Sequence, residues 1–146
     1  MISLRPIEYV DAPVLDGSEY GAMSADERLE MITSSLAKSH DGLYFEFFIV
    51  TADDAVVGFM NVCAHSKHII SVGPEIKPEY KRRGYAYEAE KIVLEMMKQK
   101  GFTIATATVL SDNVGSNALQ KKLGFEVDRT YINKHGHEAF AYIKAL

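Results

Sequence analysis

Residues 77–86 read Lys-Pro-Glu-Tyr-Lys-Arg-Arg-Gly-Tyr-Ala and join an apolar run to a long helical pattern. The cations of this stretch are Lys77, Lys81, Arg82 and Arg83, in a chain whose net charge is −4. They precede the start of a helix, where free backbone amides and the positive end of the helix dipole favour anions. Gly84 allows the backbone to approach a ligand closely because it has no Cβ atom. The stretch therefore predicts a site for a diphosphate, although charge alone would also fit a solvated basic turn.

The pattern on either side of this loop predicts an ordered series of strands and helices. We expect strands at 2–7, 43–51, 56–64, 68–76, 103–110, 126–133 and 138–144, and helices at 25–38, 84–100 and about 111–123. Residues 9–20 look irregular or weakly helical. The first helix begins with a capping box formed by Ser24 and Glu27. The second carries apolar residues on one face, at positions 85, 89, 92, 93 and 96. Turns at 53–54 and 134–136 predict antiparallel hairpins.

The two strands that flank the 84–100 helix make a βαβ unit, which requires parallel strands and a right-handed crossover. Both ends of the chain look antiparallel instead. The expected fold class is therefore α/β in the mixed α+β sense, with a mostly antiparallel sheet of six to seven strands and flanking helices.

Composition limits the class of protein. A chain of 146 residues with 47% hydrophobic and 25% charged residues is typical of one globular domain. The excess of acidic residues counts against a nucleic-acid-binding surface. A single cysteine, Cys63, excludes an internal disulfide, and no apolar run reaches the ~18 residues of a membrane span. We expect a cytoplasmic protein with neither a nucleic-acid nor a membrane partner.

Motifs narrow the identity of the anion. The chain lacks the Gly-x-x-x-x-Gly-Lys-Ser/Thr loop and the Gly-x-Gly-x-x-Gly turn of two common nucleotide-binding folds. Residues 81–86, Lys-Arg-Arg-Gly-Tyr-Ala, instead resemble the Gln/Arg-x-x-Gly-x-Gly/Ala signature of the GNAT superfamily of acyl-CoA-dependent N-acetyltransferases. Asn113-x-x-Ser116, followed by Lys122-Leu123-Gly124-Phe125, resembles a second segment of that superfamily. The resemblance is strongest to the branch that includes ribosomal-protein N-terminal alanine acetyltransferases.

The sequence departs from the family pattern in three places. Lys81 replaces the usual Gln or Arg, and Arg82 stands where many members have a second glycine. Neither change should abolish diphosphate binding, because backbone amides are expected to bind it. Gln120 stands where many members have a tyrosine that acts as general acid, so no catalytic tyrosine is assigned.

The resemblance implies one N-acetyltransferase domain over residues 1–146, with a central β-α-β cofactor unit in a GNAT-type sheet. It implies direct attack of a primary amine on the thioester of acetyl-CoA, with oxyanion donors from the backbone around Ile76 and Lys77. Asn113 would form a hydrogen bond with the cofactor arm, and Ser116 would lie near the sulfur atom of the cofactor. The expected cofactor-binding residues are Ile76, Lys77, Lys81, Arg82, Arg83, Gly84, Tyr85, Ala86, Tyr87, Asn113, Ser116 and Lys122.

The catalytic candidates are Glu75 and Ser116. Glu75 lies on the strand just before the loop and could act as general base, directly or through water. The alternative is a surface carboxylate that pairs with Lys77 or Arg83. An α-amine has a pKa of ~7.7–8.0 and a lysine amine one of ~10.4, so an enzyme without a strong base would acetylate α-amines more readily.

Several alternatives remain open at this point. The acceptor could be a small-molecule amine, a polyamine or a peptide N-terminus, and the donor could be a longer acyl-CoA. A non-catalytic acyl-CoA-binding regulatory module would share the same loop, and a basic loop could also bind a polyanion such as RNA. His65 or His68 could face the acceptor as a base. No metal site is expected, and a homodimer is an expectation drawn from the resemblance.

Overall fold

The computed structural model describes all residues from 1 to 146. Seven strands form one sheet in the order β1-β2-β3-β4-β5-β7-β6. They are β1 (Ile2–Pro6), β2 (Phe45–Ala52), β3 (Ala55–Ala64), β4 (Ile69–Ile76), β5 (Ile104–Leu110), β6 (Glu126–Ile132) and β7 (Glu138–Ala145). Every neighbouring pair is antiparallel except β4 and β5, which are parallel. The expected mixed, mostly antiparallel sheet is confirmed.

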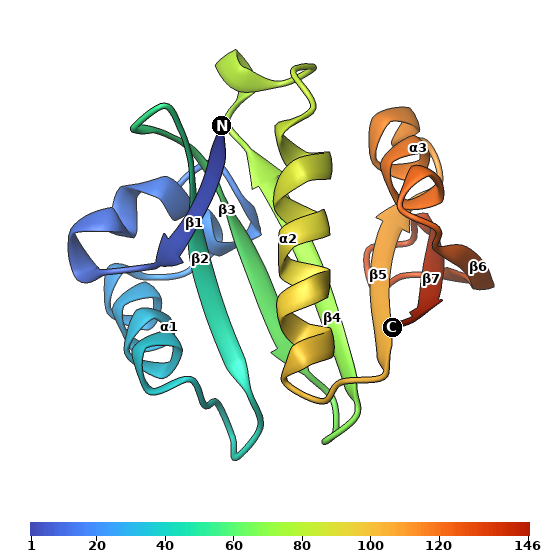
Figure 1. Ribbon diagram of the computed structural model, residues 1–146, viewed down its shortest axis with the longest axis horizontal. Coiled ribbons are helices and arrows are strands. Elements are labelled where there is room, and N and C mark those ends of the chain that lie inside the picture. Colours follow the sequence, from blue (N-terminus) through green and yellow to red (C-terminus); the bar gives the residue numbers. More distant parts are fainter.

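Helices lie on both faces of this sheet (Figure 1). They are α1 (Ala25–Ala37), α2 (Tyr85–Gln99) and α3 (Val114–Lys122), with short 3-10 helices η1 (Tyr9–Leu15), η2 (Glu19–Ala22) and η3 (Pro78–Tyr80). Helix α2 packs against β4 and β1, whereas α1 packs against β2 and η1 against β3. Helix α2 is the crossover of the βαβ unit, as the sequence predicts.

Local sequence signals account for where these elements begin and turn. The hydroxyl of Ser24 accepts a hydrogen bond from the Glu27 amide at 3.1 Å, and the Glu27 carboxylate accepts one from the Ser24 amide. This is the expected capping box. Asp53 and Asp54 both have positive φ, 48° and 71°, which is the geometry of a tight hairpin turn between β2 and β3.

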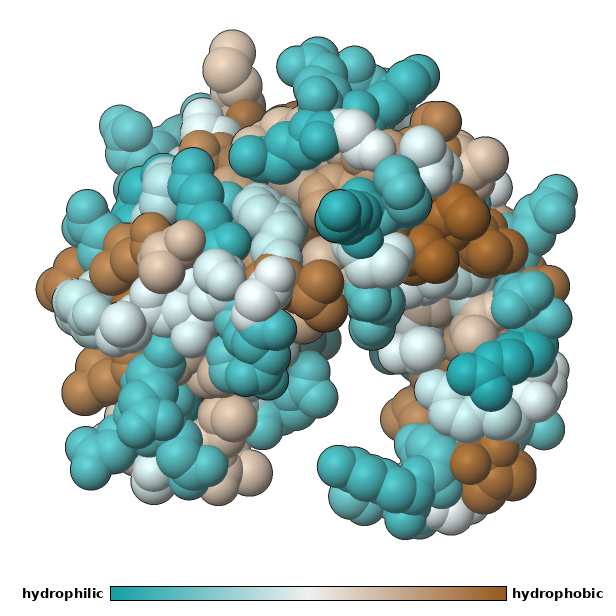
Figure 2. All heavy atoms as spheres, turned by 90° about the horizontal axis from the view of Figure 1, so that it is seen from below, coloured by the Kyte–Doolittle hydropathy of each residue, from teal (hydrophilic) through white to brown (hydrophobic).

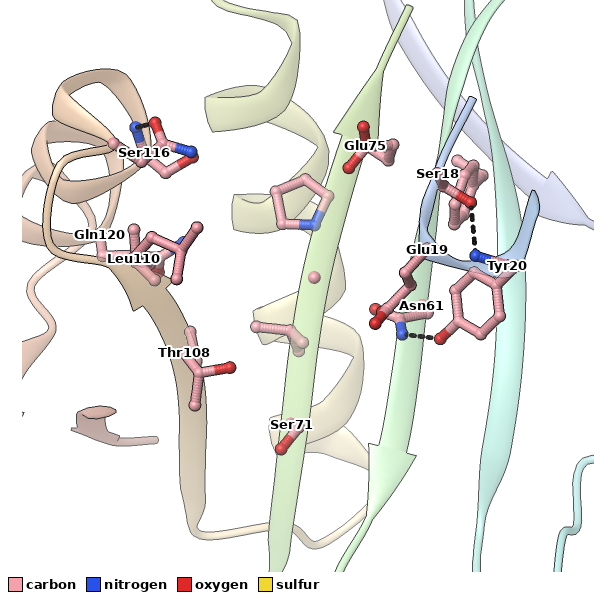
Figure 3. A pocket seen from close by; sticks show the side chains of 17 residues that line it. Ser18, Glu19, Tyr20, Asn61, Ser71, Glu75, Thr108, Leu110, Ser116 and Gln120 are labelled. Carbon is pink, nitrogen blue, oxygen red and sulfur yellow. Dashed lines mark hydrogen bonds between the residues drawn. The ribbon is translucent and has the colours of Figure 1, made fainter. Parts of the chain in front are cut away.

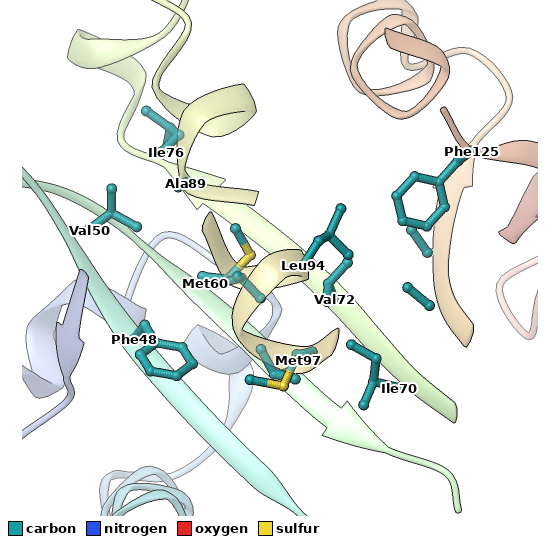
Figure 4. Close-up of a cluster of buried hydrophobic side chains, with 14 of the residues drawn as sticks. Phe48, Val50, Met60, Ile70, Val72, Ile76, Ala89, Leu94, Met97 and Phe125 are labelled. Carbon is teal, nitrogen blue, oxygen red and sulfur yellow. The ribbon is translucent and has the colours of Figure 1, made fainter. Parts of the chain in front are cut away.

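Alternating residues of β2 and β3 enter two different cores. Phe48, Met60 and Val72 belong to the core under α2, together with Val93 and Met97 of that helix (Figure 4). The opposite core contains Ile7, Leu15, Ile32, Phe45, Phe47, Ile49 and Phe59. It ends at β3, so β4 carries a hydrophobic core on only one of its faces.

The helix faces differ in part from the sequence expectation. On α2 the buried apolar residues are Ala89, Val93, Leu94 and Met97, whereas Ile92 is 37% exposed. The sequence pattern predicts instead a single apolar stripe at positions 85, 89, 92, 93 and 96. The buried stripe is rotated from the predicted one and includes Glu90, whose carboxylate accepts a hydrogen bond from Gln120 of α3.

Strands β4 and β5 separate after a short stretch of pairing. Their ladder joins Ile69–Ser71 to Ile104–Thr106 and then stops. The Lys77 amide donates a hydrogen bond to the Val57 carbonyl on β3. Because the backbone amides of successive residues point to opposite sides of a strand, the even-numbered residues of β4 direct theirs toward β5. Pro74 has no amide to offer there. The ladder cannot continue past it, and the two strands diverge toward the loop at 77–84.

Candidate active site

Two cavities meet where β4 and β5 diverge. The loop cavity, of about 440 Å³, lies between the 80–87 segment, the end of β4 and the start of α3. The strand cavity, of about 350 Å³, is lined by η2, β3, β4, β5 and α3. Pro74, Glu75, Asn113 and Ser116 line both, so the two form one continuous cleft. A space-filling view shows the molecule hollowed between the half with α1 and the half with β6 and β7 (Figure 2).

The loop cavity is built to hold an anion. No group in the chain accepts a hydrogen bond from the backbone amides of residues 82–87, and the first helical bond of α2 is donated by Glu88. Positive φ angles at Arg82 (66°) and Gly84 (80°) turn the chain here. A run of free amides at a helix N-terminus, curved by residues with left-handed backbone, is the arrangement that binds phosphate groups.

The cationic residues that were expected to bind the cofactor lie in different places, and only two of those described next line the loop cavity. Lys81 and Arg82 line the loop cavity, together with Gly84, Tyr85, Ala86 and Tyr87. Arg83 points away from this cavity. Its guanidinium carbon lies 5.5 Å from the ring centroid of Tyr80, and the group donates a hydrogen bond to the Glu79 carbonyl. Lys122 Nζ lies 4.2 Å from the ring centroid of Tyr87, beside a separate cavity of about 320 Å³. Lys81 and Arg82 form no ion pair.

The backbone at the end of β4 offers one free donor where the sequence suggested two. The amide of Lys77 donates to the Val57 carbonyl at 2.8 Å, so it is not free for an oxyanion. The Ile76 amide alternates to the other side and faces the gap left by β5. Ile76 lines the loop cavity, and Lys77 does not.

The N-terminus of α3 forms the facing wall. The Asn113 side-chain oxygen caps the helix by accepting from the Ser116 amide at 3.1 Å. The side-chain amide of Asn113 remains available to the cleft, as does the Ser116 hydroxyl. These two residues therefore lie opposite Glu75 across the junction of the two cavities.

The strand cavity is acidic and polar (Figure 3). Its only charged side chains are Glu19 and Glu75. Partial burial raises the pKa of Glu75, with the Lys81 charge acting in the opposite direction. Glu75 forms no ion pair with Lys77 or Arg83, so the alternative of a paired surface carboxylate is not what the structure shows.

A tyrosine hydroxyl also lies in this cavity. The Asn61 side-chain amide donates to the Tyr20 hydroxyl at 2.6 Å. Burial raises the pKa of Tyr20 to about 12, so the phenol keeps its proton near neutral pH. The Asn61 side-chain oxygen occupies the space where a Cβ atom at Gly73 would lie, at 2.5 Å. A larger residue than glycine at position 73 would displace Asn61.

A buried acid stands behind the cleft. Glu90 of α2 is fully buried, and the Gln120 side-chain amide donates to its Oε1 at 3.1 Å. Its Oε2 and the Gln120 oxygen have no partner in the chain. Burial raises the pKa of Glu90 to about 7, against a smaller opposing effect of the Gln120 bond.

Several residues of the cleft belong to no sequence motif. Tyr20 comes from the 3-10 helix η2, 41 residues before Asn61 in the sequence, and belongs to no motif. Asn61 was detectable as the one amide in an apolar strand. The sequence predicts Ser71 and Thr108 only as strand residues, and both line the strand cavity.

No group of three His, Cys, Asp or Glu side chains is arranged to hold a metal ion. None of the helices is long and apolar enough to cross a membrane.

Solved structures share this fold. The Brucella melitensis ribosomal-protein-alanine N-acetyltransferase aligns with a TM-score of 0.82 and 17% identity over 99% of each chain. A Salmonella typhimurium acetyltransferase that modifies the N-terminal serine of ribosomal protein L7/L12 aligns with a TM-score of 0.80 and 13% identity over 99% of this chain and 95% of its own. A further Salmonella typhimurium protein, provisionally assigned as an acetyltransferase, was solved with acetyl-CoA. It aligns with a TM-score of 0.82 and 14% identity over 100% of this chain and 94% of its own.

No curated protein sequence matches the chain. The model of the acetyltransferase (GNAT) domain matches residues 3–126. The free amides of the loop cavity fit the diphosphate of the acyl donor used by these enzymes. The chain belongs to the GNAT family and is an acetyltransferase that uses acetyl-CoA.

Proposed function

We propose that the protein acetylates an α-amino group at the N-terminus of a peptide or protein. The observation that carries this proposal is the opposite charge of the two halves of the cleft. The loop half holds Lys81, Arg82 and free amides, which suit an anionic donor. The strand half holds Glu19 and Glu75 and no cation, which suits an amine that arrives protonated.

The donor would be held by the amides of residues 82–87, with its arm along the free edge of β4. Asn113 can donate to an arm carbonyl from its uncommitted amide. The Ile76 amide can donate to an oxygen on which negative charge develops, and such donors stabilise acyl-transfer transition states. Ser116 lies between the two cavities and can protonate the departing sulfur.

In this proposal Glu75 takes a proton from the ammonium group of the arriving acceptor. It lies at the junction of the two halves, and its raised pKa makes it a better proton acceptor than an ordinary carboxylate. An α-amine is roughly one-tenth unprotonated at neutral pH, so a weak base suffices for it. A lysine side chain needs a much stronger base. The site therefore favours α-amines.

A panel of amines with mass detection of the product tests this function. We expect acetylation of short peptides at the α-amine and little product on N-terminally blocked peptides that contain lysine. Glu75→Gln should lower kcat on the order of 10²-fold with the KM for acetyl-CoA unchanged. Glu79→Gln, an exposed carboxylate outside both cavities, is the control. Binding of acetyl-CoA without any product would instead indicate a non-catalytic module.

Two narrower expectations stay predictions. A cytoplasmic location and a homodimer both derive from the sequence and its resemblance, and size-exclusion chromatography with light scattering would test the second.

A further inference from the structure

The two walls of the cleft belong to two halves of the chain. Helix α2, which begins at the anion-binding loop, packs on β4, whereas α3 packs on β5 (Figure 1). The parallel ladder between β4 and β5 ends at Ser71 and Thr106, whose hydroxyls form a hydrogen bond at 2.9 Å. Beyond this pair the two strands share no backbone pairing. The sheet therefore holds the halves together at one end of the cleft only.

Helix α3 is tied to its own half by a buried asparagine. The Asn117 side-chain amide donates to the Leu110 carbonyl at 3.0 Å, directly after β5 has run its length. The Tyr142 hydroxyl of β7 donates to the Asn117 side-chain oxygen at 2.5 Å. Asn117 and Tyr142 are both buried. Because these bonds join the helix to β5 and β7, α3 and these strands form one unit.

One hydrogen bond joins α3 to the other half across the gap. The Gln120 side-chain amide donates to Glu90 Oε1 of α2 at 3.1 Å, and both side chains are buried. No other hydrogen bond and no ion pair links α2 with α3. The contact of Lys122 with the Tyr87 ring also crosses the gap, but this lysine is exposed to solvent. A buried hydrogen bond is electrostatically stronger than one in water.

The same two side chains can form a second hydrogen bond. Glu90 Oε2 and the Gln120 oxygen are the only buried side-chain polar atoms of the chain without a partner. A proton on Oε2 can be donated to the Gln120 oxygen, which pairs a carboxylic acid with an amide through two bonds. Two parallel bonds fix the relative orientation of the partners as well as their separation.

Gln120 lies on the same face of α3 as the cleft residues of that helix. Ser116 precedes it by four residues and Asn113 by seven, which are about one and two helical turns, and all three line the strand cavity. On the opposite wall, Glu90 lies six residues after Gly84, about 9 Å along α2 from the anion-binding loop. The bond between the two helices therefore sets how far the start of α3 lies from that loop.

We propose that Glu90 and Gln120 are positioning residues, which act as a brace that holds the two walls of the cleft at the spacing that acetyl transfer requires. This proposal rests on the donor position proposed above, in which the diphosphate binds one wall and Asn113 of the other wall bonds the arm. Neither member of the brace contacts the reacting atoms. Without it, α3 shifts away from α2, and Asn113 and Ser116 lose their place beside the donor. A misplacement of about 1 Å can lower a rate on the order of 10²-fold.

Glu90→Met and Gln120→Met test the brace, because methionine preserves the length of each side chain and removes the hydrogen bond. We expect each to lower kcat/KM for acetyl-CoA on the order of 10²-fold. The double variant should be no worse than either single variant, since all three lack the same bond. Glu90→Gln can still form both hydrogen bonds with Gln120 and should keep the wild-type kcat/KM. Glu95→Met, at an exposed acid of the same helix, is the control and should behave like the wild type.

Two ligands separate loss of the brace from general damage to the fold. Coenzyme A reaches both walls, whereas adenosine diphosphate carries a diphosphate without the arm. Calorimetry with Glu90→Met should show an affinity for coenzyme A about fivefold lower than that of the wild type, as for the loss of one hydrogen bond, and an unchanged affinity for adenosine diphosphate.

Three results would each overturn the brace. They are an equal loss of affinity for both ligands, an unchanged kcat/KM in the two methionine variants, and a Glu90→Gln variant as impaired as Glu90→Met. A wild type that binds coenzyme A but acetylates no amine would overturn the proposed function alone, because the two affinities test the brace without any acceptor.

Discussion

Replacing Glu90 by glutamine should make the protein more stable at alkaline pH and leave it unchanged at acidic pH. Glu90 is fully buried between α2 and α3, and one of its oxygens and the Gln120 oxygen lack partners. A neutral carboxylic acid has an O–H that can donate to the Gln120 oxygen, whereas a carboxylate leaves Glu90 Oε2 and the Gln120 oxygen without a partner. A glutamine at position 90 supplies an N–H in the same place at every pH.

The magnitude follows from the pKa of Glu90, which burial raises from 4.5 to about 7. Between these values the folded protein holds a proton that the unfolded chain has lost, so stability falls as pH rises from about 4.5 to about 7. Above pH 7 the folded protein has lost the whole of this contribution to its free energy of unfolding. A difference of this size corresponds to about 3 kcal/mol.

Urea denaturation of the wild type and Glu90→Gln at pH 4.5 and pH 8 measures this effect. The two free energies of unfolding should agree within about 0.5 kcal/mol at pH 4.5 and differ by about 3 kcal/mol at pH 8, with Glu90→Gln more stable. The corresponding difference in Tm at pH 8 is roughly 10 °C. Glu95→Gln, on an exposed part of α2, should show no pH-dependent difference. A stability difference that is the same at both pH values would refute the reasoning.

Three further substitutions probe other parts of the fold and the cleft. Ser24→Ala removes the cap that bonds the Glu27 amide, so thermal denaturation should show a loss of about 1 kcal/mol with kcat unchanged. Gly58→Ala places a Cβ atom 2.1 Å from the Glu75 carbonyl oxygen, so β3 and β4 must separate locally; we expect a loss of about 1–3 kcal/mol and a lower kcat in steady-state assays. Arg82→Gly preserves the left-handed turn but removes a cation from the loop cavity, so the KM for acetyl-CoA should rise about fivefold, as for an exposed charge pair of roughly 1 kcal/mol, without loss of stability.

Sequence patterns predicted the order and type of the elements because each is specified locally. The cap at Ser24, the turn at Asp53 and Asp54, and the glycine at position 84 each act within a few residues. The anion-binding loop was predictable for the same reason, since its cations and its helix start are contiguous. The resemblance to acetyltransferases depended on that loop and on the segment from Asn113 to Phe125.

The strand half of the cleft could not be predicted in the same way. The bond between His65 and Ser71 depends on the register of β3 against β4, and that between Ser71 and Thr106 on the short ladder of β4 and β5. Tyr20 reaches Asn61 only because η2 folds over β3. The burial of Glu90 depends on its contact with Gln120 of α3, which helical periodicity alone does not reveal.

The central claim is that the free amides of residues 82–87 bind the diphosphate of the acyl donor. Titration of the ¹⁵N-labelled protein with coenzyme A tests it directly by following the backbone amide signals. We predict that the signals of residues 82–87 shift most, together with those of Ile76 and the start of α3. Saturable binding that leaves the 82–87 amides unshifted, or no binding by a well-folded protein, would contradict the account.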